Sequence, residues 1–153
     1  VGIFAKTFVR PSLEATLDAV RAHVLDCFQG NRAFAGVPTR PDQLEHGVIG
    51  RIQAAVAARG IQMGAMSGTF NMCHPERAER AKNLVRLRVL AGACRPLGVS
   101  VITLCTGSRD PHDMWRRHPD NDTPEAWRDM ADCIGQALQI AETYDVTLAF
   151  EQK

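Results

Sequence analysis

The sequence lacks long hydrophobic runs and carries almost no net charge. No stretch approaches the roughly 20 apolar residues that a membrane-spanning helix requires, and the start lacks the charged-then-apolar pattern of a signal peptide. The formal net charge is only +1, and lysine and arginine are scattered rather than gathered into the basic stripe that binds a nucleic-acid backbone. We therefore expect a soluble, cytoplasmic protein that binds neither membranes nor nucleic acid.

Cys-x-x-Cys pairs are also absent. The five cysteines are spread along the chain, at Cys27, Cys73, Cys94, Cys105 and Cys133. Several fall within apolar stripes, which is typical of reduced cysteines in a protein core rather than of a disulfide framework. Cys105 stands near the end of an expected strand, where a site could form, but core packing is the favoured interpretation there too.

Short apolar runs indicate the fold class. With 153 residues, of which 45% are hydrophobic, the chain can bury one globular core. The runs predict five strands, at residues 1–8, 26–29, 61–67, 99–106 and 146–151. Helix-like segments separate these strands. The alternation favours an α/β fold with a parallel sheet, because parallel neighbours need a crossover and right-handed crossovers place the helices outside.

The four expected helices are amphipathic. The first follows Ser12, a suitable N-cap; the second covers residues 43–59; the third has Pro75 in its first turn; and the fourth begins at Thr123. Apolar residues recur every three or four positions, at Leu13, Leu17, Val20 and Val24, then Val48, Ile52 and Val56, then Ala81, Leu84, Leu87, Ala91 and Cys94, and finally Ala126, Met130, Cys133, Ala137 and Tyr144. Each helix is therefore predicted to cover one sheet face, with Arg77, Arg80 and Arg86 largely off the third stripe and Trp127 fixing the start of the fourth.

Two connections are long for a domain of this size. They cover residues 30–42 and 106–122, and each follows the carboxyl end of an expected strand. Loops of this length in a compact domain are usually functional or disordered. Parallel α/β folds build their sites at the carboxyl ends of the strands, so both loops are expected near a site.

Several strings resemble a known family. They are Ser-Gly-Thr-Phe-Asn-Met-Cys-His-Pro at 67–75, the long loop string 103–121, Thr-Pro-Glu-Ala-Trp at 123–127 and Leu-Ala-Phe-Glu at 148–151. Together they resemble the sugar phosphate isomerase/epimerase family, whose xylose isomerase-like TIM barrel is shared with endonuclease IV. The resemblance runs along essentially the whole chain, and the string 103–121 is its most specific part.

The resemblance implies only part of a barrel. A complete (β/α)₈ barrel has about 250 residues, whereas five strands and four helices are expected here, so residues 1–153 are predicted to form a single partial TIM-barrel domain, the N-terminal half. The chain starts at Val1 inside an expected strand and stops soon after Glu151, so both ends look cut. Because a half-barrel would expose the backbone of its edge strands, we expect the missing C-terminal half or self-association to close the sheet.

A divalent metal is implied by the same resemblance. Members of the family bind Mn²⁺, Mg²⁺, Co²⁺ or Zn²⁺ through Glu, Asp, His and Glu at the ends of strands five to eight. Glu151 matches the first of these ligands and could also act as an acid or base; the other ligands are expected beyond residue 153. One departure is that Gln152 follows Glu151, where the family commonly has proline.

Further site candidates stand at or after the expected strand ends. The predicted substrate-binding residues are Lys6, Phe8, Gln29, Ser67, Asn71, His74, Thr106, Arg109 and Trp115. Amides, hydroxyls and cations at strand ends could bind a polyol, and Lys6 or Arg109 could meet a phosphate, while the Trp115 ring could cover a sugar. His74, His112 and His118 lack the two-ligand helical spacing of a zincin motif, which disfavours a separate metal site there.

The leading hypothesis is therefore a metal-dependent isomerase or epimerase of sugars or sugar phosphates. One alternative is a non-catalytic half-barrel fragment or assembly module, favoured by the missing ligands. A second is a metal-dependent phosphoesterase of the endonuclease IV type. The absence of a basic stripe for DNA and of several clustered histidines weakens that second alternative.

Overall fold

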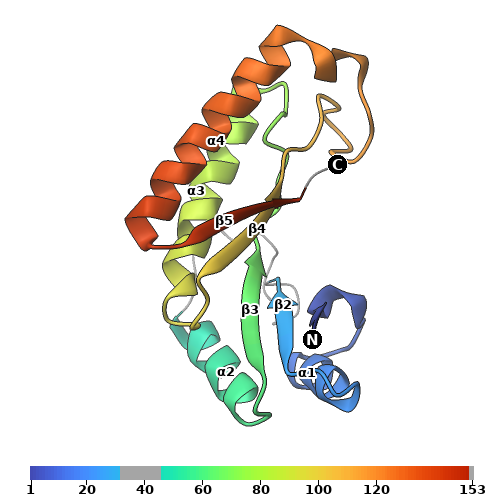
Figure 1. Cartoon of the computed structure of the whole chain (residues 1–153), viewed down its shortest axis with the longest axis vertical. Coiled ribbons are helices and arrows are strands. Elements are labelled where there is room, and N and C mark those ends of the chain that lie inside the picture. Colours follow the sequence, from blue (N-terminus) through green and yellow to red (C-terminus); the bar gives the residue numbers. More distant parts are fainter. Residues whose placement is uncertain (32–45, 152–153) are drawn as a thin grey trace.

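Five parallel strands form one sheet, in the order in which they occur along the chain (Figure 1). The computed structural model describes residues 1–31 and 46–151. The strands are β1 (Gly2–Phe4), β2 (Cys27–Gly30), β3 (Gln62–Ser67), β4 (Val101–Cys105) and β5 (Thr147–Glu151). Each neighbouring pair is parallel. The predicted parallel α/β fold is thus confirmed.

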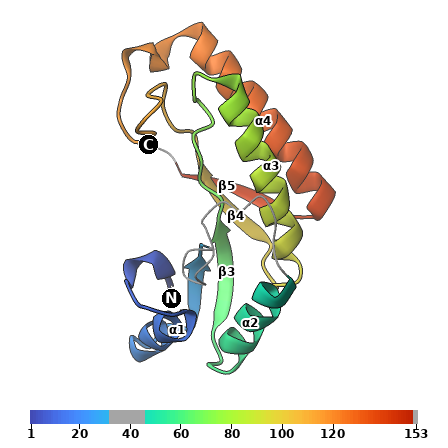
Figure 2. The same cartoon turned by 180° about the vertical axis from the view of Figure 1, so that it is seen from behind.

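In the described part of the chain, four α-helices connect the strands. They are α1 (Leu13–Ala22), α2 (His46–Ala57), α3 (Arg77–Cys94) and α4 (Pro124–Tyr144). Both views show α3 and α4 lying side by side, with β4 and β5 crossing them at an angle (Figures 1 and 2). Two predicted N-caps are confirmed, since Ser12 Oγ accepts a hydrogen bond from Ala15 N at 3.1 Å and Thr123 Oγ1 accepts one from Ala126 N at 3.2 Å.

The strands alternate between two environments. One face carries fully buried residues, including Phe28, Met66, Ile102 and Leu104, which belong to the same hydrophobic core as the inner sides of the helices. Gln29 and Thr103 alternate with these residues and therefore face the other way. On that opposite face Gln29 Nε2 donates a hydrogen bond to Thr103 Oγ1 at 2.9 Å. The sheet thus has an apolar side against the helices and a more polar side away from them.

Several predicted boundaries were wrong. The first strand ends at Phe4, and Ala5–Thr7 form a 3₁₀ turn (η1), so Lys6 and Phe8 do not close the strand. α1 ends at Ala22, and Val24 has φ of 57° and is 83% exposed rather than part of the apolar stripe. Helices need consecutive backbone hydrogen bonds, and the left-handed conformation of Val24 interrupts them.

Two other expectations also need correction. α3 begins at Arg77, after Pro75, and its N-cap residue Glu76 makes no side-chain capping hydrogen bond. Trp127 is 67% exposed in the first turn of α4, so its ring does not fix the start of that helix in the core. Most of the predicted loop 30–42 and the predicted start of the second helix at 43–45 lie outside the described residues.

The cysteines are free, and all except Cys27 are buried. Burial raises the pKa of Cys133 to about 11 and also raises the pKa of Cys73, because a thiolate is poorly solvated in the core. These two thiols stay protonated at neutral pH. In addition, none of the helices in the described part of the chain is long and apolar enough to cross a membrane.

A bulge interrupts the pairing of β2 with β3. Phe28 pairs with Met63 and Gln29 pairs with Ala65, so Gly64 is the extra residue of β3. A Cβ atom at Gly64 would lie 2.5 Å from Cys27 Sγ, which is far too close for a side chain. The extra residue lets both Met63 and Met66 be buried, although they are three positions apart. A side chain at Gly64 would therefore require Cys27 Sγ to move, and the bulge lies directly beside Gln29.

Gly64→Ala is expected to destabilise the protein by about 1–3 kcal/mol, because the new methyl group overlaps Cys27 Sγ. Denaturant unfolding followed by circular dichroism measures the change. Adding Cys27→Ala should recover part of the loss. Gly135→Ala is the control: Gly135 lies inside α4 with open space around its Cα, so alanine should stabilise by about 0.5–1 kcal/mol. An unchanged free energy of unfolding in Gly64→Ala would contradict the bulge geometry.

Candidate functional site

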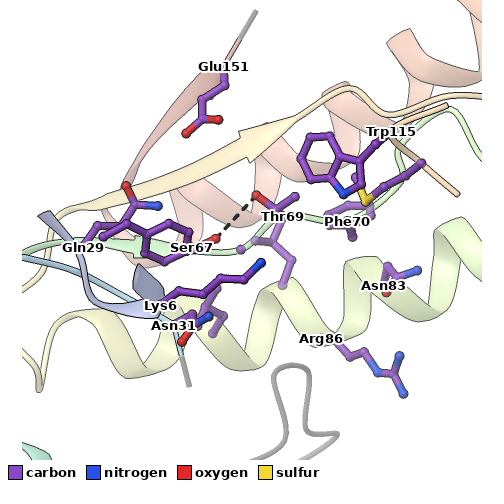
Figure 3. Close-up of a pocket in the computed structure, with 15 residues that line it drawn as sticks. Lys6, Gln29, Asn31, Ser67, Thr69, Phe70, Asn83, Arg86, Trp115 and Glu151 are labelled. Atoms are coloured by element: carbon purple, nitrogen blue, oxygen red, sulfur yellow. Dashed lines mark hydrogen bonds between the residues drawn. The ribbon is translucent and has the colours of Figure 1, made fainter. Parts of the chain in front are cut away.

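A cavity of about 270 Å³ lies at the carboxyl ends of the strands (Figure 3). Most of its polar lining comes from the strands and the residues that follow them, namely Lys6, Gln29, Asn31, Ser67, Thr69 and Glu151. Figure 3 shows Glu151 and Lys6 on opposite sides of Ser67 and Thr69. Parallel strands end at the same edge of a sheet, which is why residues so distant in sequence meet here.

An apolar wall completes the cavity. It consists of Phe4, Phe70, Leu87, Leu90, Met114 and Trp115. Phe70 is buried and forms a fixed surface, whereas Trp115 is 52% exposed. Gly68 lies between these parts, and a Cβ atom there would be 2.7 Å from Ile102 Cγ2. The close approach of β4 to this segment therefore depends on glycine.

Five of the predicted site residues meet at this cavity. They are Lys6, Gln29, Ser67, Trp115 and Glu151. Sequence reasoning missed Asn83 and Arg86, which line the cavity from α3 together with Leu87 and Leu90. Arg86 and Leu87 follow Asn83 by three and four positions, and residues at this spacing share one helix face. This spacing could have predicted that Asn83 and Arg86 lie beside the apolar residues of α3. Arg86, predicted to lie off the apolar stripe, adjoins it at the cavity.

Asn71, by contrast, is outside the cavity lining and connects two loops. Its side chain is buried, and its Oδ1 accepts hydrogen bonds from Cys73 N at 3.1 Å and Ser108 N at 3.0 Å. Its Nδ2 donates to Ser108 O at 2.7 Å and Asp110 O at 3.3 Å. Gly107 lies so close, with φ of +82°, that a Cβ atom there would overlap Asn71 Oδ1. Asn71 thus holds the loop after β3 to the loop after β4.

Arg109 is likewise used inside the protein. Its Nη1 donates to Asp129 Oδ2 at 2.8 Å, and Glu125 Oε1 lies 3.7 Å from its Nη2. Arg80 Nη2 donates to the other carboxylate oxygen of Asp129, also at 2.8 Å. Both guanidinium groups are buried, so the shared carboxylate of α4 compensates two positive charges. The position of Arg109 away from the cavity leaves its predicted contact with a substrate phosphate without structural support.

The remaining candidates also lie away from the cavity lining. His74 Nδ1 accepts a hydrogen bond from Glu76 N at 3.1 Å, and His74 O accepts one from Arg80 Nη1. Thr106 O accepts a hydrogen bond from Cys73 N at 3.0 Å. The Phe8 ring packs against His23, with 5.1 Å between ring centroids. These contacts hold together segments that surround the cavity, and the three residues do not line it.

Asp110 organises the loop that carries Trp115. Its Oδ1 accepts hydrogen bonds from His112 N and Asp113 N, both at 2.9 Å. Asp113 Oδ1 in turn accepts one from Trp115 N at 2.9 Å. The backbone N–H groups of His112 and Asp113, together with nearby Arg116, hold the pKa of the Asp110 carboxyl below its ordinary value. The ionised carboxylate therefore favours the folded loop.

The described residues supply one carboxylate to the cavity, not a complete metal site. Glu151, the last residue of β5, is the only acidic residue among the described cavity-lining residues. No group of three or more His, Cys, Asp or Glu side chains suited to a metal occurs within residues 1–31 and 46–151. The β4 residue that pairs with Glu151, Cys105, is buried. Any ion bound by Glu151 would need further ligands from elsewhere.

The fold and the cavity agree with a family assignment. The sequence matches the family model described as xylose isomerase-like TIM barrel over residues 17–152. The chain belongs to this family. The predicted resemblance and the predicted TIM-barrel type are therefore confirmed.

Solved structures with the same fold come from sugar epimerases and related proteins. An L-ribulose 3-epimerase is 20% identical, with a TM-score of 0.69, and the match covers 98% of this chain and 48% of that one. D-Psicose 3-epimerase from Clostridium cellulolyticum H10, solved with D-tagatose, is 15% identical, with a TM-score of 0.68 and coverage of 96% and 50%. A xylose isomerase-like TIM barrel protein from Mycobacterium smegmatis, in complex with magnesium, is 15% identical, with a TM-score of 0.70 and coverage of 99% and 54%.

At these identities the likeness shows the fold alone. The chain spans about half the length of the structures it matches. β1 and β5 are correspondingly the edge strands of the described sheet, each paired on one side. Among curated proteins, no sequence relative was found at a significant level.

Replacing Asp110 by asparagine is expected to destabilise the protein at pH 7 and to have little effect at low pH. The native pKa of Asp110 lies below its unfolded value, so its stabilising contribution is complete above the unfolded pKa of about 3.9. The contribution is lost as the pH falls through the native pKa. Urea unfolding at pH 7, 5 and 3 measures the difference. Asp132→Asn, at an exposed position of α4, is the matched control, and its effect on stability is expected to be small.

Proposed function

We propose that this site belongs to a metal-dependent isomerase or epimerase of sugars or related polyhydroxy compounds. The observation that carries the proposal is the position of Glu151. Its carboxylate stands at the end of β5 and lines the same cavity as the Gln29 amide, the Ser67 hydroxyl and the Trp115 ring. A carboxylate, neutral hydrogen-bonding groups and an aromatic surface are the groups that a polyol and its proton transfer require.

The polar lining suits a ligand with several hydroxyl groups. Gln29 and Ser67 both offer donors and acceptors, and Ser67 Oγ lies 3.5 Å from Thr69 Oγ1. The hydrogen bond from Gln29 to Thr103 leaves the Gln29 carbonyl oxygen able to accept from a ligand. On the apolar side, the half-exposed Trp115 ring offers a flat surface to the C–H groups of a sugar. Together these groups support binding of a sugar-sized molecule.

A divalent ion fits the chemistry of Glu151 but needs other ligands. A carboxylate suits Mn²⁺, Mg²⁺, Co²⁺ or Zn²⁺, and magnesium is present in the related structure from Mycobacterium smegmatis. When bound, such an ion polarises the carbonyl and hydroxyl oxygens of a ketose. The chain's own contribution would be the Glu151 carboxylate, as a ligand and as a possible acid or base beside the carbon that exchanges its proton. The other ligands are expected from residues beyond 153.

A second candidate is a non-catalytic half-barrel that acts as an assembly module. Two features favour it: the described sheet has open edges at β1 and β5, and the described cavity residues include a single acidic side chain. Because edge strands expose unpaired backbone groups, either the C-terminal half of a longer polypeptide or a second copy would close the sheet. On this basis the isolated 153-residue chain is expected to be inactive alone.

Glu151→Gln is expected to abolish tight metal binding or weaken it at least about tenfold, because an amide is a poorer ligand than a carboxylate for a hard cation. Titration with Mn²⁺ alone, followed by electron paramagnetic resonance on the longest polypeptide that carries this sequence, measures the change. Glu142→Gln is the matched control, since Glu142 is exposed on α4 and outside the cavity lining. Equal Mn²⁺ affinity in the Glu151 and Glu142 variants would refute the proposed metal role of Glu151.

Trp115→Ala is expected to weaken the binding of a ketose roughly fivefold, since stacking on an aromatic ring contributes about 1 kcal/mol. D-Tagatose and L-ribulose are the probes, and incorporation of solvent deuterium next to their carbonyl groups, followed by NMR, reports proton exchange by the same protein. Trp127→Ala is the control, because Trp127 is exposed on α4 and does not line the cavity. Wild-type protein that binds Mn²⁺ but exchanges no proton with any ketose would favour the assembly module.

A further inference from the structure

The loop that follows β4 supplies part of the cavity wall, through Met114 and Trp115 (Figure 3). Its base, residues 107–110, reads Gly-Ser-Arg-Asp and has no apolar side chain. The serine, arginine and aspartate of this base are nevertheless buried. Because buried polar groups need partners, the position of the base depends on hydrogen bonds and ion pairs rather than on apolar packing.

Asn71, from the loop after β3, supplies three of these hydrogen bonds. Its Oδ1 accepts from Ser108 N at 3.0 Å, and its Nδ2 donates to Ser108 O at 2.7 Å and to Asp110 O at 3.3 Å. A fourth bond, from Cys73 N to Asn71 Oδ1 at 3.1 Å, fixes the amide to its own loop. The amide oxygen thus accepts twice and the amide nitrogen donates twice, which uses its full hydrogen-bonding capacity. An apolar side chain at position 71 would make none of these bonds.

From Asp110 the hydrogen bonds continue to Trp115. Asp110 Oδ1 accepts from Asp113 N, and Asp113 Oδ1 accepts from Trp115 N, both at 2.9 Å. The backbone of Trp115 is therefore connected to Asn71 through Asp110 and Asp113. A contiguous network of this kind can carry a change at one end to the other, and a double-mutant cycle measures whether it does.

Asn121 closes the same loop on itself. Its Oδ1 accepts from Ser108 Oγ at 3.2 Å and from Arg109 N at 2.7 Å, so the last part of the loop is joined to its base. The loop is thus held by two amides, Asn71 from outside and Asn121 from within. Neither amide lines the cavity.

We propose that Asn71 is a positioning residue of this site, which sets the affinity for a polyol by holding Trp115 in place at the cavity. The inference rests on the proposed function, because the ligand is the one that the Trp115 ring contacts there. A wall that is already in place spares the ligand the entropic cost of ordering the loop. Affinity is therefore lost when the loop is released, even though Trp115 is still present.

The position of Trp115 is measured without a ligand. The protein is labelled with fluorotryptophan, and the fluorine NMR signals of Trp115 and Trp127 are assigned by their loss in Trp115→Phe and Trp127→Phe. Asn71→Ala is expected to move the Trp115 signal toward its position in urea-unfolded protein and to leave the Trp127 signal unchanged. Circular dichroism shows whether each variant is folded.

Two further variants complete this measurement. Asn121→Ala releases the loop from within and leaves the Asn71 bonds in place, so it should move the Trp115 signal in the same direction and decides the matter if Asn71→Ala fails to fold. Thr16→Ala is the matched control. Thr16 is buried on α1, and its Oγ1 donates to Ser12 O at 3.0 Å, so the variant loses a buried polar group remote from the loop. Its Trp115 signal should not move.

A double-mutant cycle then connects the position of Trp115 to binding. Isothermal titration with D-tagatose and L-ribulose should show that Asn71→Ala weakens binding roughly fivefold, as Trp115→Ala does, because both variants lose the same aromatic contact. For the same reason, the double variant should bind no more weakly than either single variant. Thr16→Ala should bind as tightly as wild-type protein.

The results that overturn the inference are distinct from those that overturn the proposed function. An unmoved Trp115 signal in folded Asn71→Ala and Asn121→Ala, or losses of affinity that add in the double variant, would show that Asn71 does not act through Trp115. The proposed function would then stand, since wild-type protein still binds the ketose. Wild-type protein that binds no ketose, even when Mn²⁺ is present, would contradict the proposed function and the inference together.

Discussion

The parallel register of β1 to β5 is the constraint on which the site depends. Because every strand runs in the same direction, Gln29, Ser67 and Glu151 reach one edge of the sheet although they come from three separate strands. The same register directs Phe28, Met66 and Ile102 to the opposite face, against the helices. A slip of one residue in any strand would exchange the two faces. The glycine bulge at Gly64 shifts the register beside Gln29 and is part of the same arrangement.

A buried polar network holds the loops at that edge in place. Asn71 connects the loop after β3 to the loop after β4 through four hydrogen bonds. Asp129 of α4 accepts from Arg80 of α3 and from Arg109 of the loop after β4. Such groups are costly to bury unless every charge and amide finds a partner, so the network is specific for one loop arrangement. Trp115 reaches the cavity because this framework and the Asp110 turn fix the loop that carries it.

The cavity brings charged and neutral polar groups together. Glu151 lies on one side of Ser67 and Thr69, and Lys6 lies on the other. The related structures share the fold and are about twice as long, so the described residues correspond to one part of a larger barrel. In the described sheet β1 and β5 are the edge strands, and each has one side without a paired neighbour.

The sequence by itself determined the order of the strands and helices and the family. Local hydrogen bonding and apolar spacing are encoded by neighbouring residues, so the N-caps Ser12 and Thr123, the strand–helix alternation and the family were predicted correctly. Only the tertiary structure decided what Arg109 and Asn71 do, because their partners Asp129 and Ser108 are distant in sequence. It also brought Arg86 of α3 to the cavity and ended β1 before Lys6. The role of a polar side chain depends on which groups the fold places around it, and spacing along one segment does not contain that information.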